Sequence, residues 1–268
     1  MSDESERVRF RQVVVLVVEG LGIGAQPDAV SDFDRGADTL AHAADYVGGL
    51  ELPFMQWLGL GNLRPIRGVP PADPPAASVG TVRRMADGRE AQTGARELFD
   101  GTLEGLVAAG VSVRILGWLA DHVDEINGVV RMGDLRGDAV VGHLIGQASP
   151  RGGAVTVASF RAPASLGGPV AFSRGLAWFD SQIAAILDII DESTLLLVSG
   201  IGGADPTYGA LAVGTREQSP LLAYTPAVPS GVDLGSRESL GDIGATLAEN
   251  FDVAHAGSGR SFFGPLLA

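Results

Sequence analysis

The stretch that decides the fold reads Val13-Val14-Val15-Leu16-Val17-Val18-Glu19-Gly20-Leu21-Gly22-Ile23-Gly24. Its first half is continuously apolar and mostly β-branched, which is typical of a strand buried on both faces of a parallel sheet. A carboxylate and a glycine-rich turn follow at once. Because ligands of open α/β sheets bind beyond the carboxyl ends of the strands, Glu19 and the turn Gly20–Gly24 are the first candidates for a site.

Further strands and helices are predicted by the apolar pattern of the rest of the chain. The strands are runs bounded by Gly or charge, and they cover Val111–Leu116, Ala154–Ala158, Leu195–Ser199 and Leu221–Tyr224. The helices have apolar residues at helical spacing and cover Ala37–Val47, Ala95–Ala109, Phe172–Ile190 and Ser239–Phe251. This alternation predicts an α/β protein with a doubly wound, mostly parallel sheet flanked by helices. We find no internal repeat or long linker, so residues 1–268 are predicted to form one domain.

Composition and charge exclude several classes of partner. The chain has 268 residues, 46% of them hydrophobic, and a net charge of −13. An acidic protein lacks the basic face that binds nucleic acid or an anionic membrane, so neither is expected as a partner. No apolar stretch approaches the 18 residues or more of a membrane span. The acidic start, Met1–Arg7, does not resemble a signal peptide, which predicts a cytoplasmic protein.

Two residue types are missing, and their absence removes further chemistry. The sequence contains no Cys, which excludes disulfides, thiolate metal sites and cysteine nucleophiles. It also contains no Lys, which excludes Schiff-base chemistry and a P-loop ATPase site.

The order of several motifs resembles one enzyme family. The turn after the first strand is followed by Gly36–His42 and by Leu58–Leu63, and two later stretches, Ser219–Pro226 and Asp242–Phe251, match as well. This order is similar to that of the phosphopentomutases, which belong to the alkaline-phosphatase-like metalloenzyme superfamily. The resemblance covers nearly the whole chain and implies an alkaline-phosphatase-like core.

The resemblance also implies where the metal ligands of the family should lie. Glu19 takes the place of an Asp, and it is the only remnant that retains a ligating side chain. The other five positions carry residues that cannot bind a metal, namely Arg161, Leu166, Ile201, Gly202 and Gly214. We therefore expect no cofactor, and an Arg at the former place of a carboxylate suggests that its charge replaces the ion.

The residue that carries phosphate in the family is replaced too. The stretch Gly88–Glu97 matches the family motif, but its Thr becomes Ala91, which has no nucleophile, although Thr93 lies nearby. In the family a substrate-gripping cap domain follows this helix. Here the chain passes directly into the next strand, so the cap is predicted to be absent between about residues 110 and 111.

These observations predict a degenerate, non-catalytic relative that acts by binding. Glycine turns offer backbone amides to an anion and Arg adds positive charge, so a phosphosugar or nucleotide is the expected ligand. The candidate ligand-binding residues are Glu19, Gly20, Thr93, Arg161, Gly202 and Asp205. Absence of the cap should expose the strand ends, which predicts a homo-oligomer or a protein partner on that face.

Two alternatives remain open. One is a metal-dependent phosphoester hydrolase or mutase-type enzyme with a rebuilt Mn or Zn site. The densest group of ligand-like residues is the acidic cluster Asp121, His122, Asp124 and Glu125, which Glu19, Asp205 and His42 could join. The other is a dinucleotide fold, because Gly20-x-Gly22-x-x-Ala25 fits the phosphate-loop pattern. That pattern needs a helix to begin at once, whereas Gln26-Pro27-Asp28 reads as a loop.

Overall fold

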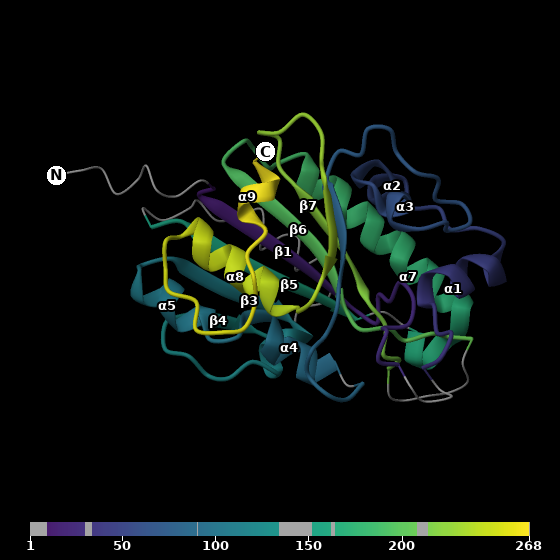
Figure 1. Cartoon of the computed structure of the whole chain (residues 1–268), viewed down its shortest axis with the longest axis horizontal. Helices are drawn as coiled ribbons and strands as arrows, with labels where there is room; N and C mark the ends of the chain where they lie inside the picture. The colour runs from purple at the N-terminus through teal and green to yellow at the C-terminus, as the bar shows by residue number, and fades with distance from the viewer. Residues whose placement is uncertain are drawn as a thin grey trace.

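The computed structural model describes residues 10–29, 34–89, 91–133, 152–161, 164–207 and 214–267, without the side chains of 164–166. The strands are β1 (Gln12–Glu19), β2 (Ser78–Val82), β3 (Ser112–Gly117), β4 (Val129–Met132), β5 (Ala154–Arg161), β6 (Thr194–Ile201), β7 (Ser219–Tyr224) and β8 (Asp233–Arg237). The helices are α1 (Thr39–Val47), α2 (Pro53–Leu58), α3 (Leu60–Leu63), α4 (Ala91–Phe99), α5 (Thr102–Ala108), α7 (Ala164–Leu187), α8 (Gly241–Asn250) and α9 (Phe263–Leu266), with a 3-10 helix η2 (Trp118–Asp121). Figure 1 shows their arrangement.

The strands form one eight-stranded sheet in the order β4-β3-β5-β1-β6-β7-β2-β8. All neighbours pair in parallel except β7, which is antiparallel to both β6 and β2. The predicted α/β fold with a mostly parallel, doubly wound sheet is therefore confirmed. Strand β1 lies at the centre, and this position explains its continuous apolar sequence, because both of its faces must be buried.

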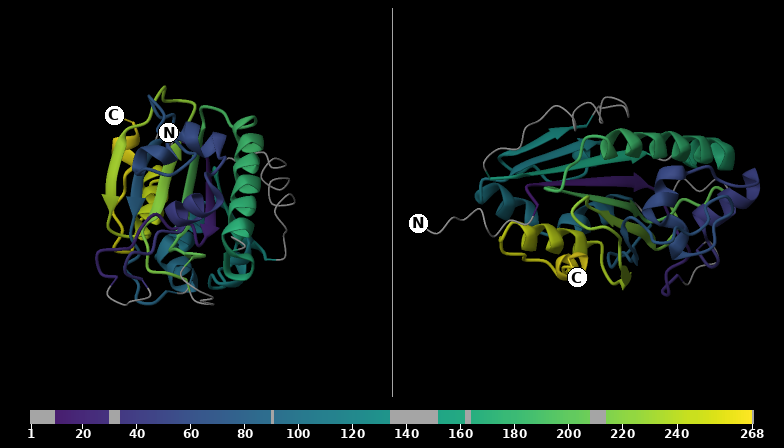
Figure 2. Two further views of the ribbon diagram at one scale, coloured as in Figure 1. Left: turned by 90° about the vertical axis from the view of Figure 1, so that its right-hand side faces the viewer. Right: turned by 90° about the horizontal axis from the view of Figure 1, so that it is seen from above.

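Helices cover both faces of the sheet (Figure 2). Side chains alternate along β1, so Val14, Leu16 and Val18 pack into one core with α1, α2 and α7. Val13, Val15 and Val17 pack into the opposite core with α4, α5 and α8. We call these the α7-side core and the α4-side core. The two cores hold β1 rigidly, so the residues at its carboxyl end have a fixed platform.

Three strands and two helix boundaries differ from the prediction. Strands β2, β4 and β8 were not predicted, because each is short and two of them lie at the sheet edges, where polar residues are tolerated. The predicted helix Ala95–Ala109 is two helices, broken at Asp100 (φ 37°) and Gly101 (φ 78°). The predicted helix Phe172–Ile190 begins earlier, as α7, and bends at Gly168, directly before Pro169.

Two local features bear on the site. Asp38 caps the first turn of α1, where its carboxylate accepts a hydrogen bond from the Ala41 amide at 3.3 Å. Between α5 and β3 lie only residues 109–111, the point at which the cap domain was predicted to be absent.

Among the described residues, no helix has the length and apolar content needed to cross a bilayer.

Candidate functional site

Three neighbouring strands end side by side at the carboxyl edge of the sheet. In the parallel register, Glu19 of β1 lies opposite Arg161 of β5 on one side and Ile201 of β6 on the other. A carboxylate, a guanidinium and an alkyl chain therefore occupy consecutive places in one row. We call this row the strand-end row.

The two charged members of the row form a loose ion pair. Arg161 Nε lies 3.7 Å from Glu19 Oε2, and the two side chains are 69% and 37% exposed. Partial burial raises the pKa of the Glu19 carboxyl, and the nearby charges of Arg161 and His122 act in the opposite direction. At such exposure the pair contributes little to stability, about 0–1 kcal/mol. Both groups are therefore available for other interactions.

The strand-end row does not fit a divalent metal. A metal site in such an edge needs several carboxylate or imidazole ligands, and this row supplies one carboxylate next to a cation. Within the described part of the chain, no three His, Asp or Glu side chains are placed to hold one ion. Leu166, one of the expected ligand positions, has a side chain outside the described residues. The described side chains of the row therefore supply one carboxylate and one guanidinium, and no complete ligand set.

A second arginine lies beside the neighbouring loop. Gly202 has a left-handed backbone (φ 65°), and a Cβ built on it would lie 3.2 Å from Nη1 of Arg84. Arg84 is only 2% exposed, and its Nη2 donates to the carbonyl of Gly88 at 2.5 Å. Burial and the neighbouring Arg216 lower the pKa of Arg84. Gly202 thus packs against a buried cation.

The first turn of α4 packs against the end of the same strand. A Cβ on Gly94 would lie 2.4 Å from Ile201 Cγ2, so helix and strand touch at this glycine. Ala91 is the first residue of α4, and the half-buried Thr93 follows in the same turn. The side chain of Gln92 contacts Nε2 of His122 at 3.2 Å. This end of α4 therefore faces the strand-end row from the α4-side core.

The glycine turns differ from the anion site that the sequence predicted. In the first turn, the Gly22 amide donates to the carbonyl of Gly20 and the Ile23 amide to the carbonyl of Gln218. The Gly24 amide donates to Oε2 of Glu217. In the second, the amides of Gly202 and Gly203 donate to Ser219 Oγ and Thr215 O. At Gly20 (φ 76°) the chain packs against Ala204, because a Cβ added to Gly20 would lie 2.7 Å from the Cβ of Ala204. Both turns therefore hydrogen-bond mainly to the segment Thr215–Ser219, and these five amides are used within the protein.

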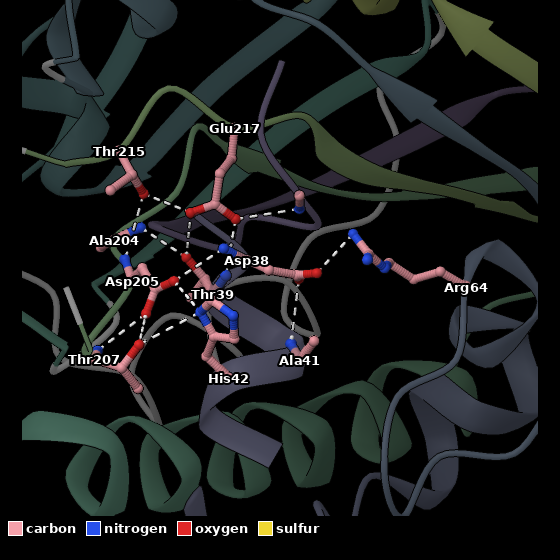
Figure 3. A network of polar contacts seen from close by, with 11 residues as sticks. Asp38, Thr39, Ala41, His42, Arg64, Ala204, Asp205, Thr207, Thr215 and Glu217 are labelled. Carbon is pink, nitrogen blue, oxygen red and sulfur yellow. Dashed lines mark hydrogen bonds and ion pairs between the residues drawn. The ribbon is translucent and has the colours of Figure 1, made fainter. Parts of the chain in front are cut away.

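Asp205 lies in a buried hydrogen-bond network, away from the expected role of a ligand (Figure 3). Its Oδ2 accepts from the Asp38 amide at 2.9 Å and contacts Nδ1 of His42 at 2.6 Å. Its Oδ1 accepts from the amide and the hydroxyl of Thr207 at 3.0 and 2.7 Å. Burial disfavours the charged form, but these donors outweigh it and lower the pKa of Asp205. The carboxylate therefore anchors its own loop to the start of α1.

Glu217 completes this network, and the sequence analysis did not single it out as a site residue. It is 1% exposed, and its Oε2 accepts from the amides of Thr39 and Gly24 at 2.8 and 3.2 Å. Its Oε1 accepts from the hydroxyls of Thr39 and Thr215. Burial raises the pKa of Glu217, and the donated hydrogen bonds oppose this. The survival of Thr215-Arg216-Glu217 in the sequence was the available signal.

The acidic cluster of the metal alternative does not converge. Glu125 pairs with Arg131 at 3.0 Å, and its side chain is 87% exposed. His122 turns Nδ1 to the Trp118 carbonyl at 2.8 Å and its other nitrogen to Gln92. Asp121 and Asp124 are exposed. His42, the other candidate, is occupied with Asp205.

Sequence comparison finds full-length relatives at low identity. The phosphopentomutase of Symbiobacterium thermophilum is 26% identical over 387 aligned residues, which cover 94% of this chain and 98% of the relative. That of Syntrophotalea carbinolica is 24% identical, with 97% and 99% covered. No protein-family model matches the chain.

Comparison with solved structures supports the fold. The alkaline phosphatase of the Antarctic bacterium TAB5 superposes with a TM-score of 0.55 and 10% identity, covering 92% of this chain and 99% of that one. A 2-O GAG sulfatase gives a TM-score of 0.60 at 9% identity, covering 96% and 74%. The eight-stranded α/β core is thus alkaline-phosphatase-like.

Proposed function

We propose that this chain, a phosphopentomutase-like member of the alkaline phosphatase superfamily, is a non-catalytic protein that binds a phosphorylated small molecule at the strand-end row. The ligand class is a phosphosugar or a nucleotide. The names of its relatives make a phosphopentose the first compound to test.

One observation carries this proposal. Arg161, Glu19 and Ile201 stand in register where a metalloenzyme of this fold would gather its ligands, and a guanidinium is present there instead. Arg binds phosphate through two parallel N–H···O bonds, and its charge does not depend on pH. Its only ion-pair partner among the described residues is Glu19, at 3.7 Å, which a phosphate can outcompete.

The start of α4 supports the non-catalytic part of the proposal. Ala91 cannot form a phosphoenzyme, because its methyl group is not a nucleophile. Thr93 lies one half-turn on and supplies a hydroxyl that can contact a ligand from the α4 side. The glycine amides and Asp205, which the sequence predicted as ligand contacts, support other parts of the fold. The proposed ligand contacts therefore reduce to Arg161, Glu19 and Thr93.

The predicted absence of a cap bears on partners. The alignment with the Symbiobacterium relative spans 387 residues, more than the 268 of this chain, so that relative contains residues without a counterpart here. The direct connection of α5 to β3 is consistent with a deletion at this point. We propose that a second copy or another protein covers the strand-end face in place of a cap. Light scattering at micromolar concentration tests this, and a monomer that captures no partner contradicts it.

The binding proposal is tested by calorimetric titration with ribose 5-phosphate and, as a control, ribose. We expect saturable binding of the phosphate ester only. Arg161→Ala should weaken it roughly tenfold or more, because a charge-assisted pair is lost. Arg67→Ala removes an equally charged, exposed side chain from a distant loop and should change nothing. If the Arg161 and Arg67 variants bind ribose 5-phosphate with equal affinity, Arg161 is not part of the binding site.

The metal-dependent alternative is tested on the same purified protein. Elemental analysis and titration with Mn²⁺ and Zn²⁺ should find no stoichiometric ion and no binding tighter than millimolar. Tight binding of one or two ions, lost in Glu19→Gln, would instead favour a rebuilt site and phosphoester hydrolysis.

A further inference from the structure

A cavity of about 140 Å³ opens beside the carboxyl ends of β1 and β5, under α7. It belongs to the α7-side core, whereas the start of α4 lies in the opposite core. The residues that line it are Val18, Phe160, Arg161, Phe172, Gly175, Leu176, Trp178 and Phe179. All of them except Arg161 are apolar or lack a side chain.

Aromatic rings form the walls of the cavity. The ring of Phe160 lies 5.0 Å from that of Phe179 and 6.0 Å from that of Trp178, centre to centre. Phe172 and Phe179 are buried in the core, and Trp178 is 40% exposed at the opening. Gly175 contributes only backbone to the α7 wall, and this missing side chain leaves space for a ligand.

The volume matches one small ring. Apolar cavities of about 150 Å³ stay dry and take up benzene, because water cannot form its hydrogen bonds there. A ring that enters this cavity buries its apolar surface, and that burial favours binding. The walls admit a single ring or a branched alkyl group of the same size.

Arg161 gives this apolar cavity a charged rim. Its side chain is 69% exposed, and its Nε lies 3.7 Å from Glu19, so the guanidinium can turn to a carboxylate at the mouth and bind it with two hydrogen bonds. We propose that the cavity binds a small carboxylic acid with one aromatic ring, the ring inside and the carboxylate on Arg161.

This inference goes beyond the proposed function and shares only Arg161 with it. A phosphorylated ligand would lie on the strand ends towards α4, where Thr93 is, and needs no apolar cavity. The aromatic acid needs the walls of α7 and does not use Thr93. Each of the two sites can therefore fail without the other.

The test uses the full chain and three probes: 3-phenylpropionate, its neutral analogue 3-phenylpropan-1-ol, and propionate, which has no ring. Binding is followed by calorimetry and by ligand-observed NMR. We expect 3-phenylpropionate to bind roughly tenfold or more tightly than either comparator, because only it uses both the ring cavity and the guanidinium. Arg161→Gln should reduce its affinity to that of the alcohol.

Variants of the walls separate this cavity from the strand-end row. Gly175→Leu places a side chain in the cavity and should abolish binding of both ring compounds while leaving the ribose 5-phosphate titration unchanged. If Gly175→Leu does not fold, the second variant is Trp178→Ala at the exposed opening. It should weaken the binding of both ring compounds. Thr93→Val should leave 3-phenylpropionate binding unchanged. The proposal is overturned if 3-phenylpropionate does not saturate at millimolar concentration, if the alcohol binds equally well, or if folded wall variants bind like the wild type.

Discussion

Two groups of charged residues lie close together at the carboxyl edge of this sheet, and they are built in opposite ways. In the buried network, the carboxylates of Glu217 and Asp205 are 1% and 5% exposed, and every oxygen accepts hydrogen bonds from the protein. In the strand-end row, Glu19 and Arg161 are partly exposed, and Arg161 Nε lies 3.7 Å from Glu19 Oε2. The first group therefore holds the loops in place, and the second is left to meet a ligand.

Acidic residues at the carboxyl edge of a sheet fall into two kinds, which their hydrogen-bond partners distinguish. A carboxylate with all its acceptors used by backbone amides is a structural residue, however close it lies to a strand end. A carboxylate with one weak partner is the better functional candidate. Stability measurements distinguish the two, because the first group should matter greatly for folding and the second hardly at all.

The largest effect is expected at Glu217. Glu217→Ala leaves the amides of Thr39 and Gly24 without an acceptor, and each unsatisfied buried donor costs about 1–3 kcal/mol. We expect a loss of roughly 3–5 kcal/mol in the free energy of unfolding, measured by urea denaturation.

Glu217→Gln is the matched control. Its amide oxygen can accept from the two backbone amides, and its NH₂ can donate to the hydroxyls of Thr39 and Thr215, which can rotate to accept. We therefore expect Gln to retain most of the stability that Ala loses. An Ala variant as stable as the Gln variant would show that the network does not hold the fold.

A smaller loss is expected for Asp205→Asn. Backbone amides donate to both oxygens, from Asp38 on one side and Thr207 on the other, so an NH₂ group in either position meets a donor. We expect a loss of about 1–3 kcal/mol near neutral pH.

The loss at Asp205 should depend on pH with a definite sign. The folded pKa of Asp205 is lowered from the ordinary value of 3.8. The stability that the charged form contributes is therefore fully present above that value and is lost as pH falls through the folded pKa. The difference in unfolding free energy between wild type and Asp205→Asn should shrink below about pH 4, and a difference that grows on acidification would contradict this assignment.

The smallest effect is expected in the strand-end row. Glu19 has a raised folded pKa, so its protonated form is favoured in the folded state, and any stability tied to that form is lost as pH rises through the folded pKa. Glu19→Gln resembles the protonated form and should change stability by less than about 0.5 kcal/mol in either direction near neutral pH. The same holds for Arg161→Gln. A loss of unfolding free energy as large as that of Asp205→Asn would show that Glu19 and Arg161 hold the fold, as Asp205 does.

The apolar pattern predicted most of the central sheet. Runs such as Val13–Val18 and Leu195–Ser199 need burial on both faces, and only the middle of a helix-covered parallel sheet supplies it. The apolar pattern did not predict the short strands β4 and β8, because each lies at an edge of the sheet and is partly exposed. The antiparallel direction of β7 was also beyond it, since a buried strand has the same composition in either direction.

The candidate site was predicted in part. The motif order placed Glu19, Arg161 and Ile201 at strand ends, and the register of β5, β1 and β6 brings them into one row. The glycine turns and Asp205, predicted as ligand contacts, hydrogen-bond within the protein, and a sequence does not show which donors meet which acceptors. The aromatic cavity was missed for the same reason: Phe172, Leu176 and Phe179 read as an ordinary helix stripe.

The amino-acid sequence defined the chemistry available to this protein: no thiol, no lysine, no nucleophile at Ala91, and a carboxylate and an arginine at predicted strand ends. It also determined the layered fold, because hydrophobic periodicity is local and is written along the chain. Three-dimensional packing, in contrast, sets which of these groups are already hydrogen-bonded within the protein. Hydrogen bonds between Glu217 and Thr39, and the space left beside Gly175, depend on residues far apart in sequence that packing brings within a few ångströms.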